Sequence, residues 1–113
     1  MYTETFSLNS TYQVADWVVR KCGRICIMHG VSFKGIKQKD HIYDIGQIPK
    51  PAYYPISVVQ VNTMGVQSGS LVRYVISLAS GGATISIVKY INTAFESVEY
   101  IYNSFMYIGA RGH

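Results

Sequence analysis

Cys22, Cys26 and His29 come nearest, by type and spacing, to a metal or redox site. Three residues separate the cysteines, whereas zinc knuckles and thioredoxin-like sites use two, and no second pair of ligands follows. If residues 22–29 lie on one strand, His29 has the opposite parity to Cys22 and Cys26 and points to the other face. We therefore expect no metal and no other cofactor. Cys26 should pack as a small apolar residue and Cys22 should lie at a turn; a disulfide across that turn is the alternative, over a tight span.

The stretch "DHIYD", residues 40–44, is the second place where chemistry could be built. Asp40 and Asp44 flank His41 and Tyr43, so a general acid and a general base are available within one segment. A solvated polar loop is the commoner meaning of such a cluster. The sequence contains no nucleophile elbow, phosphate-binding loop or dinucleotide motif, and we predict that the protein is not an enzyme.

Tyrosine is abundant, with ten residues in the chain, and it suits sugar rings because it combines a flat apolar face with a polar tip. Only residues 40–54 offer aromatic faces together with several polar groups. We predict a shallow saccharide site there, formed by Asp40, His41, Tyr43, Tyr53 and Tyr54. In the alternative, the two adjacent tyrosines close the end of the fold and the acidic residues are solvated.

The elements that position these residues are predicted to be strands. Apolar side chains recur at every second position in four runs: residues 24–33, 54–62, 70–78 and 84–91. The first run places Ile25 and Ile27 on one face and Cys26 and Met28 on the other. Turns are predicted at residues 22–23 and 80–82, and the glycine and prolines of residues 44–55 predict a loop that ends in a strand start. Near the C-terminus we expect strands at residues 98–102 and 105–110, with a helical turn at 93–97 as the alternative to a loop.

These patterns predict an all-β protein: an antiparallel β-sandwich of jelly-roll-like form, with seven or eight short strands and no convincing helix. Trp17 stands on a strand directly before the Arg20-Lys21 pair. A tryptophan in a hairpin is more often packed than displayed, so we expect Trp17 to be structural rather than a platform for a ligand.

The 113 residues are expected to form one domain over residues 1–113, with residues 1–12 as a lead-in or first strand. Charged residues make up 14% of the chain, where about 25% is usual, so part of the surface should be buried against other subunits or covered by uncharged polar groups. The net charge of +4 is spread along the sequence, and nucleic-acid binding is not expected. Membrane insertion and a secretory signal are not expected either, for want of a long apolar run and of a basic flank.

The segment "DWVVRKCGRICIMHG" resembles the hairpin that begins a small head domain in tail proteins of phages infecting Gram-positive bacteria. In that family an aromatic-Arg-Lys strand turns at a glycine, and the next strand ends in Trp-Gly, where this chain has His29-Gly30. "YYPISVVQVN" is similar to the family's Tyr-Pro-led strand, and "FMYIGARGH" to its terminal strand. The resemblance covers residues 17–111 and departs from the family in the missing second tryptophan and in "KGIKQKD". The matching hairpin residues are Trp17, Arg20, Lys21 and Gly23.

Such domains are β-sandwiches that trimerise at the tip of a baseplate or tail fibre and either bind cell-wall or capsule saccharides or serve as structural adaptors. The resemblance thus implies a homotrimeric virion protein of the tail tip or baseplate, made in the host cytoplasm. It would recognise a host cell-surface polysaccharide and contact other virion tail proteins. The alternatives are a purely structural trimerisation module of the virion without a ligand, and a cellular carbohydrate-binding or interaction β-sandwich.

Overall fold

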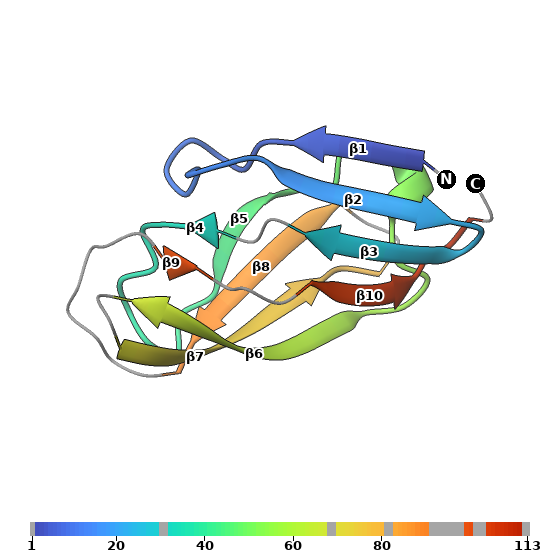
Figure 1. The fold of residues 1–113 in the computed structure, drawn as a ribbon. Helices are drawn as coiled ribbons and strands as arrows, with labels where there is room; N and C mark the ends of the chain where they lie inside the picture. Colours follow the sequence, from blue (N-terminus) through green and yellow to red (C-terminus); the bar gives the residue numbers. More distant parts are fainter. Residues whose placement is uncertain are drawn as a thin grey trace.

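The computed structural model describes residues 2–29, 32–67, 70–80, 83–90, 99–100 and 104–111, which form two antiparallel β-sheets packed face to face (Figure 1). The first sheet has four strands in the order β1–β2–β3–β10, and the second has six in the order β4–β9–β6–β7–β8–β5. The predicted antiparallel β-sandwich is confirmed, with ten strands in the described residues instead of seven or eight. The strands of the first sheet span Tyr2–Phe6, Trp17–Cys22, Ile25–His29 and Phe105–Ile108. Those of the second span, in spatial order, Ser32–Phe33, Glu99–Tyr100, Val59–Gln67, Ser70–Leu78, Thr84–Lys89 and Tyr43–Gln47.

The inner faces of the two sheets meet in one hydrophobic core, because alternate residues along each strand point inward. Trp17 is fully buried there and donates its indole N–H to the Ser32 carbonyl at 2.9 Å, so the expectation of a structural tryptophan is confirmed. The core residues that alternate along the longer strands are Trp17, Val19, Cys26, Met28, Phe105, Tyr107, Tyr74, Ile76, Leu78, Ile85 and Ile87.

The hairpin of β2 and β3 turns at Gly23, whose φ of +60° suits glycine, as predicted. Cys22 lies exposed before the turn and Cys26 lies buried after it, and both are free, which confirms the roles expected of them. The prediction from strand parity that Cys22 and Cys26 share a face opposite His29 is wrong. It treats the hairpin as one strand, whereas the turn sends Cys22 outward and Cys26 inward, and strand parity gives His29 the outer face with Cys22.

The run predicted as one strand over residues 24–33 is divided between the two sheets. β3 ends at His29 in the first sheet, and β4 begins at Ser32 in the second. Ile25 is 49% exposed on the outer face, while Cys26 and Met28 point into the core. The more polarisable sulfur-bearing side chains therefore pack inward, and the isoleucines are left outside.

The strand β5 is not predicted by the sequence, because Gly46 and the prolines indicate a loop. In the structure β5 pairs with β8, with a register shift between Asp44 and Gly46. A Cβ at Gly46 would stand 2.9 Å from Leu8 Cδ2 and 3.2 Å from Leu8 Cα, and the Asn9 N–H donates to the Ile45 carbonyl at 2.9 Å. Gly46 therefore allows the segment after β1 to approach the strand closely, rather than ending the strand.

The remaining elements are short. After β5 the chain makes a single 3₁₀ turn, η1, at Pro51–Tyr53. β9 lies within the predicted strand at 98–102, and β10 within that at 105–110. The alternative helical turn at 93–97, and residues 81–82 of the predicted glycine turn, lie outside the described residues. Among the residues that are described, no helix is long and apolar enough to cross a membrane.

Candidate functional site

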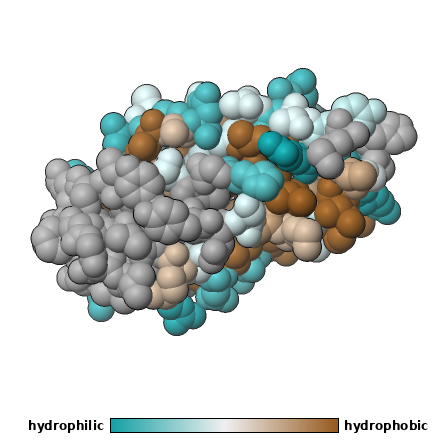
Figure 2. All heavy atoms as spheres, viewed as in Figure 1, coloured by the Kyte–Doolittle hydropathy of each residue, from teal (hydrophilic) through white to brown (hydrophobic). Residues whose placement is uncertain are grey.

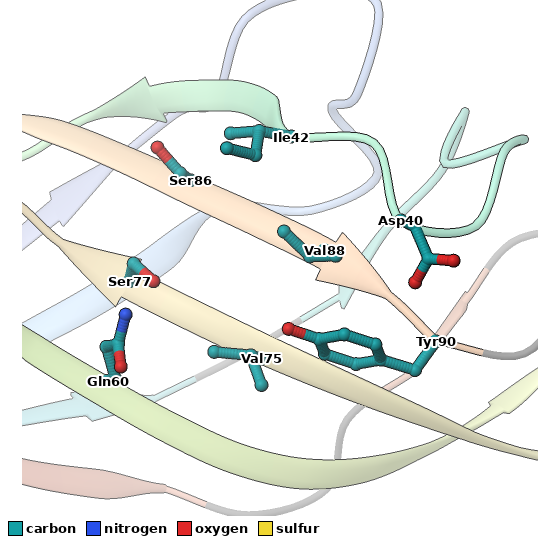
Figure 3. Close-up of a pocket in the computed structure, with 8 residues that line it drawn as sticks. All are labelled: Asp40, Ile42, Gln60, Val75, Ser77, Ser86, Val88 and Tyr90. Atoms are coloured by element: carbon teal, nitrogen blue, oxygen red, sulfur yellow. The ribbon is translucent and has the colours of Figure 1, made fainter.

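The outer face of the six-stranded sheet carries a hollow of about 400 Å³, which we call the sheet hollow (Figure 3). Its strand residues alternate with core residues such as Ile76 and Ile87, so the pleat of β7 and β8 turns them outward. The residues that line the sheet hollow are Asp40, Ile42, Gln60, Val75, Ser77, Ser86, Val88 and Tyr90.

A row of polar side chains crosses four strands at one side of the sheet hollow. The register places Gln60 opposite Ser77, Ser77 opposite Ser86, and Ser86 opposite Asp44. Ser86 Oγ donates a hydrogen bond to Asp44 Oδ1 at 2.8 Å, which holds this carboxylate at the end of the row. The row thus presents an amide, two hydroxyls and a carboxylate at cross-strand spacings of about 5 Å.

An apolar strip lies beside the polar row. Val75 and Val88 are partners across β7 and β8, and Ile42, 67% exposed, flanks them from the segment before β5. Figure 3 shows the Tyr90 ring reaching from the end of β8 across the hollow toward Val75. The Arg73 guanidinium lies 5.3 Å from the centre of that ring, a cation–π contact that restrains it. The hollow therefore joins an exposed aromatic ring to an apolar floor and a hydrogen-bonding row.

Asp40 stands at the rim of the sheet hollow in a strained backbone conformation. Its φ of 58° lies in the left-handed region, which aspartate tolerates better than most residues. Its N–H donates to the Lys89 carbonyl at 2.8 Å, and this bond ties the rim to the end of β8. Next to it, the His41 and Tyr43 rings meet edge to face with centres 4.8 Å apart, and the Tyr43 hydroxyl accepts the Gln38 N–H at 3.0 Å.

The five residues of the predicted saccharide site do not form one surface. Asp40, His41 and Tyr43 lie together near the end of β8, and of the five only Asp40 lines the sheet hollow. Tyr53 and Tyr54 follow a segment whose backbone bonds to Ala83, before the start of β8. The six residues of β8 span about 20 Å, so the two groups lie at opposite ends of this strand.

The two adjacent tyrosines are also poorly exposed. Tyr53 is 5% exposed, and its carbonyl accepts the Tyr107 hydroxyl at 2.7 Å. Tyr54 is half-buried against the core, and its carbonyl accepts the Ala110 N–H at 2.9 Å. Both tyrosines help to close one end of the sandwich. This is the role that the sequence analysis gives as the alternative to a saccharide site.

The lining residues with polar groups that the sequence does not single out are Gln60, Ser77, Ser86 and Tyr90. For Ser77, Ser86 and Tyr90 the signal is present, as the positions opposite the apolar face in two of the alternating runs, whereas Gln60 shares its parity with Ile56 and Val58 and carries no such signal. What the runs do not contain is the register that aligns β6, β7 and β8, and only this register assembles the row.

The outer face of the four-stranded sheet has a different character. Ile25 pairs with Ile108 and Ile27 with Met106 across β3 and β10, which gives a block of four apolar side chains that we call the β3–β10 patch. Three of them, all but Ile27, are between 49% and 67% exposed. Figure 2 shows apolar side chains gathered over these two strands.

No protein-family model, curated protein or solved structure matches the chain. The fold, the sheet hollow and the β3–β10 patch are therefore the observations from which we infer a function.

Proposed function

We propose that the protein is a non-catalytic saccharide-recognition domain of a phage tail tip or baseplate, which acts as a homotrimer and binds a host cell-surface polysaccharide. The observation that carries this proposal is the sheet hollow, where a hydrogen-bonding row lies beside an apolar strip and an exposed tyrosine ring. A pyranose presents the complementary arrangement, with hydroxyls around its edge and C–H groups on its faces. Ligand sites commonly combine an apolar lining with a few polar groups that fix orientation.

In the proposed complex the sugar ring lies over Val75 and Val88, with Tyr90 against one face. The Gln60 amide can both donate and accept, which suits a sugar hydroxyl that does the same. Asp44, held by Ser86, accepts from a second hydroxyl at the far end of the row. These groups favour a neutral glycan over an acidic one, as does the Asp40 carboxylate at the rim.

The β3–β10 patch supports the homotrimer. Full burial of an isoleucine or methionine contributes about 1.5–3 kcal/mol, so covering the three half-exposed side chains contributes roughly 2–5 kcal/mol for each subunit. The patch and the sheet hollow lie on opposite outer faces of the sandwich, so assembly through the patch leaves the hollow open. Three weak sites on one particle then gain avidity on a repeating polysaccharide.

A purely structural trimerisation module of the virion is the second candidate. The β3–β10 patch alone favours it, since an apolar outer face needs a partner whether or not the hollow holds a sugar. The two candidates differ in one measurable property, namely glycan binding by an intact trimer.

The test begins with a glycan array and with adsorption to isolated cell walls of Gram-positive bacteria, followed by titration of the best glycan. Tyr90→Ala and Gln60→Ala should each weaken binding about tenfold or more, which corresponds to about 1.4 kcal/mol, because each removes a direct contact. Val14→Ala is the control, since Val14 is 37% exposed in the segment between β1 and β2 and lines neither of the two hollows that the structure describes. It should bind as the parent does.

Circular dichroism and light scattering accompany every variant, so that loss of fold is separated from loss of contact. Absence of binding to any glycan or cell wall by a folded trimer would favour the structural module. Full binding by both Tyr90→Ala and Gln60→Ala would show that the sugar lies elsewhere.

A further inference from the structure

A second hollow, of about 250 Å³, lies beside η1, at the end of the sandwich away from Asp40. Lys21 extends into it from the inner face of β2, opposite Tyr2 of β1, and is 1% exposed. We call it the lysine hollow, and its lining residues are Tyr2, Lys21, Lys50, Ala52 and Tyr53.

Lys21 is a buried cation without a carboxylate partner among the described residues. Its Nζ donates to the Ala52 carbonyl, and an ammonium group has three N–H donors. The ion pair at this hollow joins the other lysine, Lys50, to Glu4 at 2.5 Å. Burying a charge without an opposite charge beside it costs free energy of desolvation, so a bound anion would stabilise the Lys21 ammonium group.

The weakly acidic side chains around Lys21 do not supply that charge at neutral pH. Lys21 Nζ and Cys26 Sγ lie 3.5 and 3.3 Å from the point where a Cβ would stand on Gly109, so the two share one small space. Burial raises the pKa of the Cys26 thiol, and burial likewise raises the pKa of the neighbouring Tyr107 phenol, whose hydroxyl donates to the Tyr53 carbonyl. Burial also raises the pKa of Tyr53, and all three groups therefore stay neutral.

We propose that the lysine hollow is a binding site for a small monocarboxylate, whose negative charge pairs with Lys21 and Lys50. The two lysines and Glu4 together carry one net positive charge, which matches a monoanion. The Tyr2 ring and the Ala52 side chain offer apolar surface to the body of the ligand. A volume of about 250 Å³ limits that body to the size of a single sugar acid or hydroxy acid. The site does not depend on saccharide recognition at the sheet hollow.

The test measures the melting temperature, and the amide NMR resonances of Lys21, Ala52 and Tyr53, during titration at constant ionic strength. The probes are sodium acetate, sodium D-glucuronate, inorganic phosphate, sodium chloride and glucose. Both carboxylates should raise the melting temperature and shift these resonances in a saturable manner, whereas chloride and glucose should not. Equal effects of chloride and carboxylate, or tighter binding of phosphate than of either carboxylate, would overturn the assignment.

Lys21→Met locates the effect, because it keeps an unbranched apolar side chain and removes the charge; replacement of a buried charge by an apolar group is often tolerated. It should weaken carboxylate binding at least tenfold. Lys89→Met is the matched control, since Lys89 is equally buried but donates to the Ile36 carbonyl, at 2.6 Å, outside the lysine hollow. It should keep the response. Lys50→Gln is a second test variant, which should fold because Lys50 is exposed. It should weaken carboxylate binding even if Lys21→Met fails to fold. An unchanged response in both Lys21→Met and Lys50→Gln rejects the site.

Discussion

The two outer faces of the sandwich differ although their strands share the same inward alternation. On β7 and β8 the residues opposite the core include Ser77 and Ser86 as well as Val75 and Val88, so these strands are apolar on the inner side and mixed on the outer side. On β3 and β10 the residues opposite the core are Ile25, Met106 and Ile108, so these strands are apolar on both sides. Strands that are apolar on both sides are typical of sheets covered on both faces, whereas clean alternation is typical of sheets with one solvated face.

We propose that this difference separates two tasks. In the proposed assembly the β3–β10 patch is the surface that another chain covers, and the sheet hollow is the surface that meets water and polar ligands. An average of 14% charged residues hides this division, because it reports the whole chain and not its faces. Variants on one outer face should therefore leave the property of the other face unchanged.

The largest effect should come from the core that both faces share. Trp17→Ala removes a fully buried ring and its bond to the Ser32 carbonyl, and it should lower the free energy of unfolding by about 3–5 kcal/mol. Assembly and glycan binding should then fail together. Urea denaturation measures the loss, with Val18→Ala, its half-buried neighbour on the outer side, as a control that changes stability much less. A stable Trp17→Ala variant that has lost only glycan binding would make Trp17 part of the ligand site.

The next largest effect concerns the β3–β10 patch. The double variant Ile25→Asp, Met106→Asp places two charges on the surface that we propose to be covered, and it should convert the trimer to a monomer in light scattering at micromolar concentration. Affinity for a single soluble sugar should stay at the parent's value, while adsorption to cell walls should fall by about 10²-fold or more as avidity is lost.

The reciprocal variant is Ser77→Asp on the other outer face. It should keep the trimer and lose the sugar, because the larger side chain fills part of the sheet hollow and adds a second carboxylate to a polar row that already contains Asp44. Assembly through the β3–β10 patch would be contradicted by a monomeric parent protein, or by an Ile25→Asp, Met106→Asp double variant that is still trimeric.

Much of the fold could be predicted because alternation is a local property. The inward faces of β7 and β8, the turn at Gly23 and the burial of Cys26 all follow from residues close in sequence. β5 could not, because Gly46 meets Leu8 from a distant segment, and the same glycine indicates a loop when it is considered alone. The division of β3 from β4 is also non-local, since it depends on which sheet each half joins.

The candidate site was less predictable for the same reason. The sequence draws attention to Asp40 and its neighbours because they lie close along the chain, whereas Gln60, Ser77 and Ser86 come from three different strands. Strand pairing brings these three together, and a shift of one residue would turn them toward the core. Tyr53 illustrates the opposite error, in which a predicted site residue is not available to a ligand. A tyrosine in a proline-rich segment is expected to be exposed, but Tyr53 is buried.

The smallest effect is the pH dependence of the free energy of unfolding, which distinguishes the buried inner faces of the sheets from their outer faces. Burial raises the pKa of Tyr107, and of Cys26 beside it, so the unfolded chain releases these protons at lower pH than the folded chain does. The stability that they contribute is therefore complete well below about pH 8.5, the pKa of a thiol in the unfolded chain, and is lost as pH rises toward the raised values. For Tyr107 alone the loss should be on the order of 1 kcal/mol by about pH 10.5.

Urea denaturation of the parent and of Tyr107→Phe between about pH 8 and pH 10.5 measures this loss. The variant should be less stable at pH 8, because the bond to the Tyr53 carbonyl is gone, but its stability should fall less steeply with pH, because one buried proton is no longer released. Val19→Ala is the matched control: it weakens the same core without removing an ionisable group, and it should keep the parent's slope. If Tyr107→Phe and Val19→Ala had equal slopes, the phenol of Tyr107 would ionise alike in the folded and unfolded chains, and the inner face of β10 would be wetter than its burial indicates.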